Sequence, residues 1–124
     1  MEERRIGISF SLKWSCVLIY QETMKALGYP EFFRFLINED AHKLALEVCN
    51  YADDGFHIVP ERKEGESYRI YSLGLLQMIW EMCGWKEGES FRAFGIPYPK
   101  QRIVEFDLNN AESIADVDFL DPKE

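Results

Sequence analysis

The fold of this chain is decided by two stretches, VLIYQETMKALGYPEFFRFLINEDAHKLALEV at residues 17–48 and YRIYSLGLLQMIWEMCGWKEGESFRAFGIPYPKQRIVEF at residues 68–106. Each begins with a short apolar segment ending in Ile-Tyr, passes through helix-forming residues to Gly plus an aromatic residue, and closes with a hairpin pattern. The matched positions are Gly28-Tyr29 with Gly84-Trp85, and Phe33-Arg34 with Phe91-Arg92. A unit this small cannot bury its apolar face alone. The sequence therefore predicts one folding unit used twice.

The alternation of apolar and polar residues predicts most of the strands. Residues 6–12 alternate with a period of two, which indicates a half-buried strand. Further strands are expected at residues 16–19, 33–37, 44–48 and 56–59. The second hairpin has its arms at 91–94 and 102–108, and we expect the two prolines of residues 95–99 to lie in its turn because proline cannot donate to a ladder.

Two helices are expected between these strands. Residues 21–27 are good helix formers and end at Gly28, but barely two turns need tertiary packing to hold them. Residues 73–83 have an apolar stripe at helical spacing, with Ser72 as the N-cap and Gly84 as the stop.

Together these elements predict an α+β protein in which two strand-helix-hairpin repeats form one compact, mostly antiparallel β body with two short helices. Residues 1–108 are expected to be a single domain, with repeats at about 16–59 and 68–108 and the polar linker PERKEGES at 60–67. Residues 109–124 are expected to be an acidic tail.

The net charge of −8 is unevenly distributed. Residues 105–124 contain seven acids and one base, a net charge of −6, which leaves −2 for residues 1–104. Such a charge argues against a large nucleic-acid-binding surface. It does not exclude a small basic surface on the side of the protein away from the tail.

The sequence predicts a cytoplasmic protein that does not enter a membrane. The longest apolar run is only a few residues, and the N-terminus has no apolar segment of signal-peptide length. The odd number of cysteines, Cys16, Cys49 and Cys83, favours buried thiols over a disulfide framework.

The strand, short helix and hairpin, used twice, resemble the swapped-hairpin family typified by AbrB, SpoVT, MazE and MraZ. The resemblance covers about residues 16–48 and 68–107 and rests on Leu18-Ile19-Tyr20, Ala26-Leu27-Gly28 and the hairpin arms. Tyr20 and Tyr71 stand where that family often has proline, and the second helix is longer than its pattern. The alternative is an unrelated α+β fold. The resemblance implies two interlocked hairpins in a transcription regulator or an antitoxin.

The resemblance also implies where DNA would bind, because these regulators use basic residues near the first strand and the helix start. The positions that fit are Arg4, Arg5, Lys13, Lys25 and Arg69. Phosphate contact needs several such cations on one face. Glu2, Glu3 and Glu22 dilute this cluster, and the alternative is a set of ordinary solvated surface charges.

Catalysis, metals and cofactors are not predicted. His42 and His57 have no second His or Cys at a helical metal-binding spacing, and no glycine cluster has the form of a phosphate-binding loop. A Cys49–His57 nucleophile pair has no accompanying sequence signature.

The acidic tail is the candidate segment for a protein partner. Its apolar residues alternate with aspartates, a composition that stays soluble when free and can place apolar anchors in a basic groove. The candidate anchors are Ile114, Val117, Phe119 and Leu120. A tail that only solvates the protein, or that folds on its own body, is the alternative.

The sequence thus predicts a non-enzymatic binding module, an AbrB-like regulator or antitoxin-like protein. The second hypothesis is a protein–protein adaptor or phage-type accessory protein that does not bind nucleic acid. We expect a protein partner, and DNA in the first case only. Two repeats in one chain fit either a monomer that acts as a pseudo-dimer or a homodimer.

Overall fold

The structure of the chain, a computed structural model, describes residues 5–62 and 65–114. In chain order the elements are β1 (Gly7–Ser11), β2 (Cys16–Ile19), α1 (Gln21–Ala26), β3 (Phe32–Asn38), β4 (Lys43–Val48), β5 (Phe56–Ile58), β6 (Tyr68–Tyr71), α2 (Leu73–Cys83), β7 (Ser90–Tyr98), β8 (Ile103–Asp107), the 3-10 turn η1 (Leu108–Asn110) and β9 (Glu112–Ile114). The prediction of a mostly antiparallel body with two helices is confirmed.

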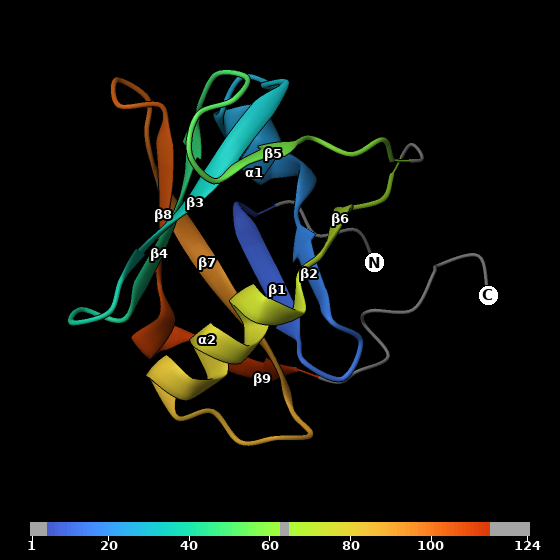
Figure 1. The fold of residues 1–124 in the computed structure, drawn as a ribbon, viewed down its shortest axis with the longest axis vertical. Helices are drawn as coiled ribbons and strands as arrows, with labels where there is room; N and C mark the ends of the chain where they lie inside the picture. Colours follow the sequence, from blue (N-terminus) through green and yellow to red (C-terminus); the bar gives the residue numbers. More distant parts are fainter. Residues whose placement is uncertain (1–4, 63–64, 115–124) are drawn as a thin grey trace.

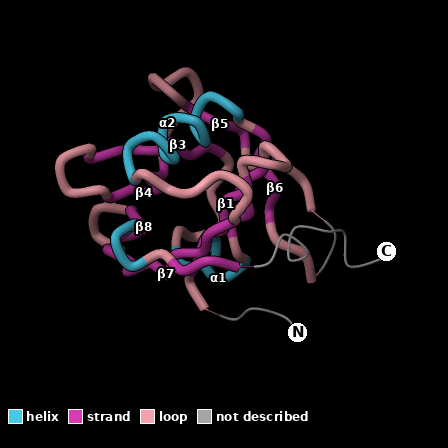
Figure 2. The backbone as a smooth tube through the Cα atoms, turned by 90° about the horizontal axis from the view of Figure 1, so that it is seen from below, coloured by secondary structure: helices cyan, strands magenta, loops and turns pink. Residues whose placement is uncertain are grey.

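The strands form one curled sheet in the order β5-β3-β4-β8-β7-β1-β2-β6, with β9 paired to β7. Every pairing among the described strands is antiparallel. The long strand β7 connects the two parts, because its residues 91–94 pair with β1 and its residues 95–98 pair with β8. Figure 1 shows β7 crossing between β3, β4 and β8 on one side and β1, β2 and β6 on the other, and Figure 2 shows the curl from below.

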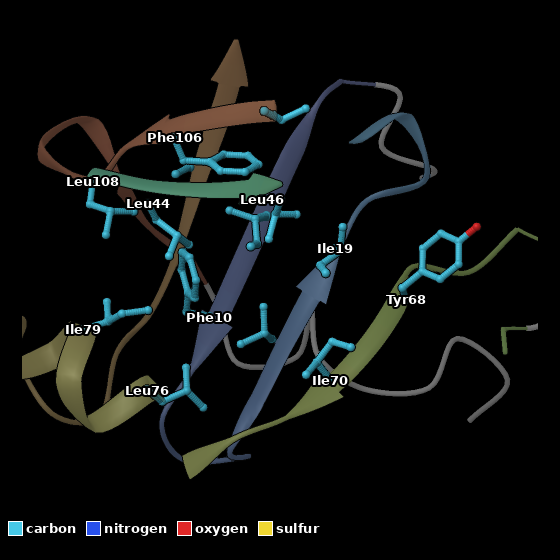
Figure 3. Packing of buried hydrophobic residues seen from close by; sticks show 14 of the residues in the cluster. Phe10, Ile19, Leu44, Leu46, Tyr68, Ile70, Leu76, Ile79, Phe106 and Leu108 are labelled. Carbon is cyan, nitrogen blue, oxygen red and sulfur yellow. The ribbon is translucent and has the colours of Figure 1, made fainter. Parts of the chain in front are cut away.

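The main core lies inside the curl. Inward-facing residues from both parts of the sheet meet there, among them Phe10, Leu44, Leu46 and Phe106, which are all fully buried. Figure 3 shows these side chains converging with Leu76 of α2. The apolar stripe of α2 therefore closes the concave side of the sheet.

Helix α2 has the caps that its sequence predicts. The Ser72 side chain accepts a hydrogen bond from the Leu75 amide at 3.4 Å, and Gly84 ends the helix in the left-handed conformation at φ 64°. The prediction of a helix at 73–83 is confirmed.

The side chain of Thr23 ties helix α1 to β1, and Met24 anchors the same helix in the main core. Its N-cap, Tyr20, makes no side-chain capping bond. Instead, the buried hydroxyl of Thr23 donates to the Gly7 carbonyl at 2.7 Å and accepts from the Gly7 amide at 2.8 Å. These two bonds tie the first turn of the helix to β1, which gives a six-residue helix the tertiary support that its length requires.

Two details of the predicted strands are wrong. Pro97 lies in β7 opposite Val104, whereas Pro99 lies in the turn as predicted. Residues 96–98 pair with β8 alone, while the Gly95 amide still donates to the Ile6 carbonyl at 3.0 Å. A strand with one partner tolerates a residue that lacks an N–H. Strand β1 is not half-buried, because Ser9 and Ser11 on its polar face are 2% and 0% exposed.

The chain continues in regular structure beyond residue 108. The turn η1 and the strand β9 follow, and β9 pairs with the first residues of β7. The segment predicted as an acidic tail thus begins with an added strand. Neither described helix is long and apolar enough to cross a bilayer.

Candidate functional site

One row of side chains crosses five strands on the side of the sheet opposite the core. Arg69 of β6 lies opposite Leu18 of β2, which in turn lies opposite Ser9 of β1. Ser9 lies opposite Arg92 of β7, and Glu112 of β9 follows Arg92. Directly opposed residues of antiparallel strands share a face. Two arginines and one glutamate are therefore on the same side of the sheet.

A second, small apolar cluster lies on this side. Cys16, Leu18 and Tyr20 are buried in it, and Phe94 and Ile114 pack against them. The hydroxyl groups of Ser9 and Tyr20 share a hydrogen bond. This side of β1 and β2 is consequently packed, because Ser9, Leu18 and Tyr20 are all buried there.

The Phe94 ring holds two guanidinium groups. The Cζ of Arg5 lies 3.4 Å from the ring centroid and the Cζ of Arg92 lies 5.2 Å from it, both within cation–π range. Gly7 lies opposite Phe94 in the sheet, and a Cβ at Gly7 would lie 2.6 Å from the Tyr20 ring. Glycine is thus what allows the Tyr20 ring to lie across β1.

Arg92 is fixed by an ion pair with the added strand. Its Nη2 and Nε lie 2.6 Å and 3.0 Å from the same carboxylate oxygen of Glu112. Burial lowers the pKa of Arg92, but the hydrogen bond to Glu112 and the neighbouring Tyr20 outweigh burial, so the pKa lies above its ordinary value. Arg92 therefore stays charged, and its guanidinium group binds the carboxylate of Glu112.

Arg69 is at the other end of the row. Its Nη1 lies 3.5 Å from the sulfur of Cys16. Burial raises the pKa of the Cys16 thiol, although the charge and hydrogen bond of Arg69 oppose this effect. We call the surface defined by Arg5, Arg69 and Arg92 the arginine face.

The residues predicted to contact DNA are only partly brought together. Arg5 and Arg69 are on the arginine face. Lys13 lies in the turn between β1 and β2, whereas Lys25 lies in the last turn of α1, after the far end of β2. Arg4 lies outside the described residues.

Arg92 belongs to this surface, but sequence reasoning used it only as a marker of the repeat. Its neighbours Phe91 and Ala93 are buried in the core, so alternation alone places Arg92 on the opposite side. What the sequence did not contain was a signal for the pairing of β7 with β1, because these strands are far apart in the chain.

Of the residues predicted to bind a protein partner, Ile114 is half-buried at the end of β9 and packs against the small apolar cluster. Val117, Phe119 and Leu120 lie outside the described residues.

The surroundings of His57 and Cys49 do not activate either group as a nucleophile. The His57 ring stacks on Phe33 at 5.4 Å and meets Phe35 edge-on at 5.2 Å, and burial lowers its pKa. Burial and the carboxylate of Asp53 raise the pKa of the Cys49 thiol. At neutral pH this thiol is protonated, and a thiol is a weaker nucleophile than a thiolate.

A hollow of about 470 Å³ lies between the β3–β4 turn and α2. Its lining residues are Glu39, Asp40, His42, Met78, Glu81 and Met82. In the described ranges 5–62 and 65–114, no group of three His, Cys, Asp or Glu side chains could hold a metal ion. The three carboxylates repel anions, so this hollow does not compete with the arginine face for a polyanion.

Comparisons with protein-family models, curated proteins and solved structures found no match to this chain.

Proposed function

We propose that the chain is a non-enzymatic, cytoplasmic binding module that contacts a nucleic-acid backbone through the arginine face, as an AbrB-like transcription regulator would. The observation that carries this proposal is the placement of Arg5, Arg69 and Arg92 on one side of four adjacent strands. Arginine is suited to this role because its planar fork matches phosphate oxygens and its charge persists at all physiological pH values.

The spacing of the arginines supports contact with more than one phosphate. Arg69 and Arg92 are separated by three strand intervals, about 14 Å at the usual spacing of sheets. Groups this far apart reach different phosphates, so their contributions to affinity add.

The pairing of β2 with β6 and of β4 with β8 supports the proposed resemblance to swapped-hairpin proteins. When Ile19-Tyr20 is aligned with Ile70-Tyr71, Leu18 corresponds to Arg69. These two corresponding residues lie opposite each other in the β2–β6 pair. Strands β4 and β8, which are the second hairpin arms of the two stretches, also pair with each other. Matched positions that cross-pair in this way are expected of two copies of one unit around a two-fold axis. We infer a monomer that acts as a pseudo-dimer, and light scattering distinguishes it from a homodimer.

The alternative proposal is a protein–protein adaptor or phage-type accessory protein without a nucleic-acid role. The observation that favours it is the Arg92–Glu112 ion pair, in which the arginine face already binds a carboxylate. An acidic peptide would offer the same chemistry as Glu112. The net charge of −8 also lowers general affinity for polyanions.

Salt dependence separates the two proposals. If three arginines each neutralise a phosphate, affinity for a mixed-sequence duplex should fall about 40-fold between 50 and 200 mM salt, because bound counterions are released. Fluorescence anisotropy of a labelled duplex measures this change. The absence of binding even at 50 mM salt would remove the regulator and leave the adaptor.

A further inference from the structure

A second hollow, of about 330 Å³, lies where α2 and the loop between α2 and β7 meet the end of β1. Its described lining residues are Leu12, Gln77, Trp80, Glu81, Trp85 and Glu87. Gln77, Trp80 and Glu81 have the spacing that places side chains on one face of a helix. The volume is at the lower end of the range for small-molecule sites, about 300–1,000 Å³, so a small ligand fits. We call this the tryptophan hollow.

Two indole rings form part of its wall, and both are held in place. The ring centroids of Trp80 and Trp85 lie 5.0 Å apart, with the ring planes at 89°. Trp80 belongs to the main core, and its Nε1 donates a hydrogen bond to the Lys86 carbonyl at 3.4 Å. Trp85 stacks on Phe91 at 4.3 Å, and its amide donates to the Trp80 carbonyl at 3.1 Å. The rings therefore form a fixed aromatic corner, and binding there needs no reordering of these side chains.

The charge at the tryptophan hollow is negative. Glu81 and Glu87 are both exposed, and no cationic side chain is among the described lining residues. Within residues 5–62 and 65–114, neither carboxylate makes an ion pair. An aromatic corner beside two such carboxylates attracts a cation, because the face of an indole ring is electron-rich.

The lining also indicates which kind of cation fits. A primary ammonium group has three N–H donors and a guanidinium group has five, and each donor needs an acceptor when it leaves water. The hollow offers only Gln77, Glu81 and Glu87 as side-chain acceptors, and the rest of its lining is apolar. A quaternary methylammonium group has no N–H to satisfy, and its methyl groups can contact both apolar and aromatic walls.

We propose that the tryptophan hollow binds a trimethylammonium group. The indole rings of Trp80 and Trp85 contact the methyl groups. The carboxylates of Glu81 and Glu87 balance the positive charge. Choline and the trimethylated lysine side chain of another protein both carry this group. The inference does not depend on the proposed nucleic-acid contact.

The test is an NMR titration of the full chain with choline chloride, in which sodium chloride keeps the ionic strength constant. The indole Nε1–H signals of Trp80 and Trp85 should move along a saturating curve, with a dissociation constant of millimolar order for so small a ligand. Trp14, which is 44% exposed in the β1–β2 turn, should not move and so controls for non-specific contact with indole rings.

A neutral isostere of choline, in which carbon replaces the nitrogen, separates charge from shape. It should bind at least about tenfold more weakly than choline, because it has the same methyl groups and no attraction to the rings or carboxylates. A short peptide with one trimethyllysine identifies the source of the group. Tighter binding of this peptide than of choline assigns a protein partner, and weaker binding assigns a small molecule.

The carboxylates are tested by E81Q/E87Q, which changes two exposed side chains. We expect this variant to bind choline about fivefold more weakly than wild type. The matched control is E31Q/E61Q, which removes the same charge from two exposed glutamates and should stay within about twofold. Glu31 follows α1 and Glu61 follows β5, and Figure 1 shows α1 and β5 at the opposite end of the molecule from the loop between α2 and β7.

Three results would overturn the inference. In the first, the signals of Trp80 and Trp85 respond to neither choline nor the peptide. In the second, choline and its neutral isostere bind equally well. In the third, E81Q/E87Q has the circular dichroism spectrum of wild type and binds choline just as tightly.

Discussion

Thr23 joins the first helix to the first strand through one buried hydroxyl. It satisfies both the amide and the carbonyl of Gly7, at 2.8 Å and 2.7 Å. Burying a backbone group without a partner costs about 1–3 kcal/mol. The sequence contained no signal for this contact, because a threonine inside a helix pattern usually indicates nothing about a strand 16 residues away.

Replacement of Thr23 tests this contact. Thr23→Val keeps the shape but removes both hydrogen bonds; the Gly7 carbonyl still accepts from the Tyr20 amide at 3.1 Å, so the unpaired group is the Gly7 amide and we expect a loss of about 1–3 kcal/mol in the free energy of unfolding. Thr23→Ser keeps the hydroxyl and loses only a methyl group, at a cost of about 1 kcal/mol. Urea denaturation measures both. Equal stability of the two variants would show that the hydroxyl does not hold the helix.

His57 gives the fold a pH dependence. Burial between aromatic rings lowers its pKa below the ordinary value of 6.5. The unfolded chain therefore binds a proton at this residue before the folded chain does, and stability falls as the pH drops below about 6.5. The loss is complete only below the lowered pKa of the folded state.

We expect the melting temperature of the wild-type chain to fall more steeply between pH 7 and pH 5 than that of His57→Gln. Calorimetry at half-unit intervals measures the difference. The carboxylates are the same in both proteins, so the difference isolates the histidine. Parallel curves would contradict a His57 whose pKa is lowered by its half-buried position between the rings.

At the scale of elements, β7 determines how the sheet curls. Its partner changes from β1 to β8 between Phe94 and Gly95. A Cβ at Gly95 would lie 2.7 Å from side-chain atoms of both Val104 and Phe106, which are fully buried. Gly95 therefore allows the close approach of β8 at the point where the strand changes partner.

Gly95→Ala should destabilise the chain by about 1–3 kcal/mol, because the core is already filled. Gly74→Ala is the matched control: Gly74 lies in the first turn of α2 with no atom within 4 Å of an added Cβ. Alanine is the better helix former, so this control should gain about 0.5–1 kcal/mol. Thermal unfolding measures both, and a Gly95→Ala variant as stable as wild type would contradict this role.

Elements were predictable where their signals are local. Helix α2 follows from its stripe and from Ser72 and Gly84, and the first hairpin follows from alternation and the turn after Asn38. Pro97 was misplaced, because its tolerance depends on which side of β7 lacks a partner. That arrangement is set by the order of the whole sheet.

At the scale of the whole molecule, the two sides of the curled sheet differ in chemistry. The concave side holds the main core, and the other side of β6, β2, β1 and β7 holds the arginine face. The sequence predicted Arg5 and Arg69 as candidates. Their placement on the same face as Arg92 depends on pairings between strands that are far apart in the chain. The acidic hollow next to α2 concentrates negative charge elsewhere.

The arginine face carries the proposed nucleic-acid contact, and the most direct test is duplex binding by the R69Q/R92Q variant at 50 mM salt. The control is R102Q, which removes one exposed arginine from the β7–β8 turn. We predict that R69Q/R92Q binds a labelled duplex at least about tenfold more weakly than wild type while R102Q stays within about twofold. An R69Q/R92Q protein that is folded by circular dichroism and binds the duplex as tightly as wild type would contradict the account.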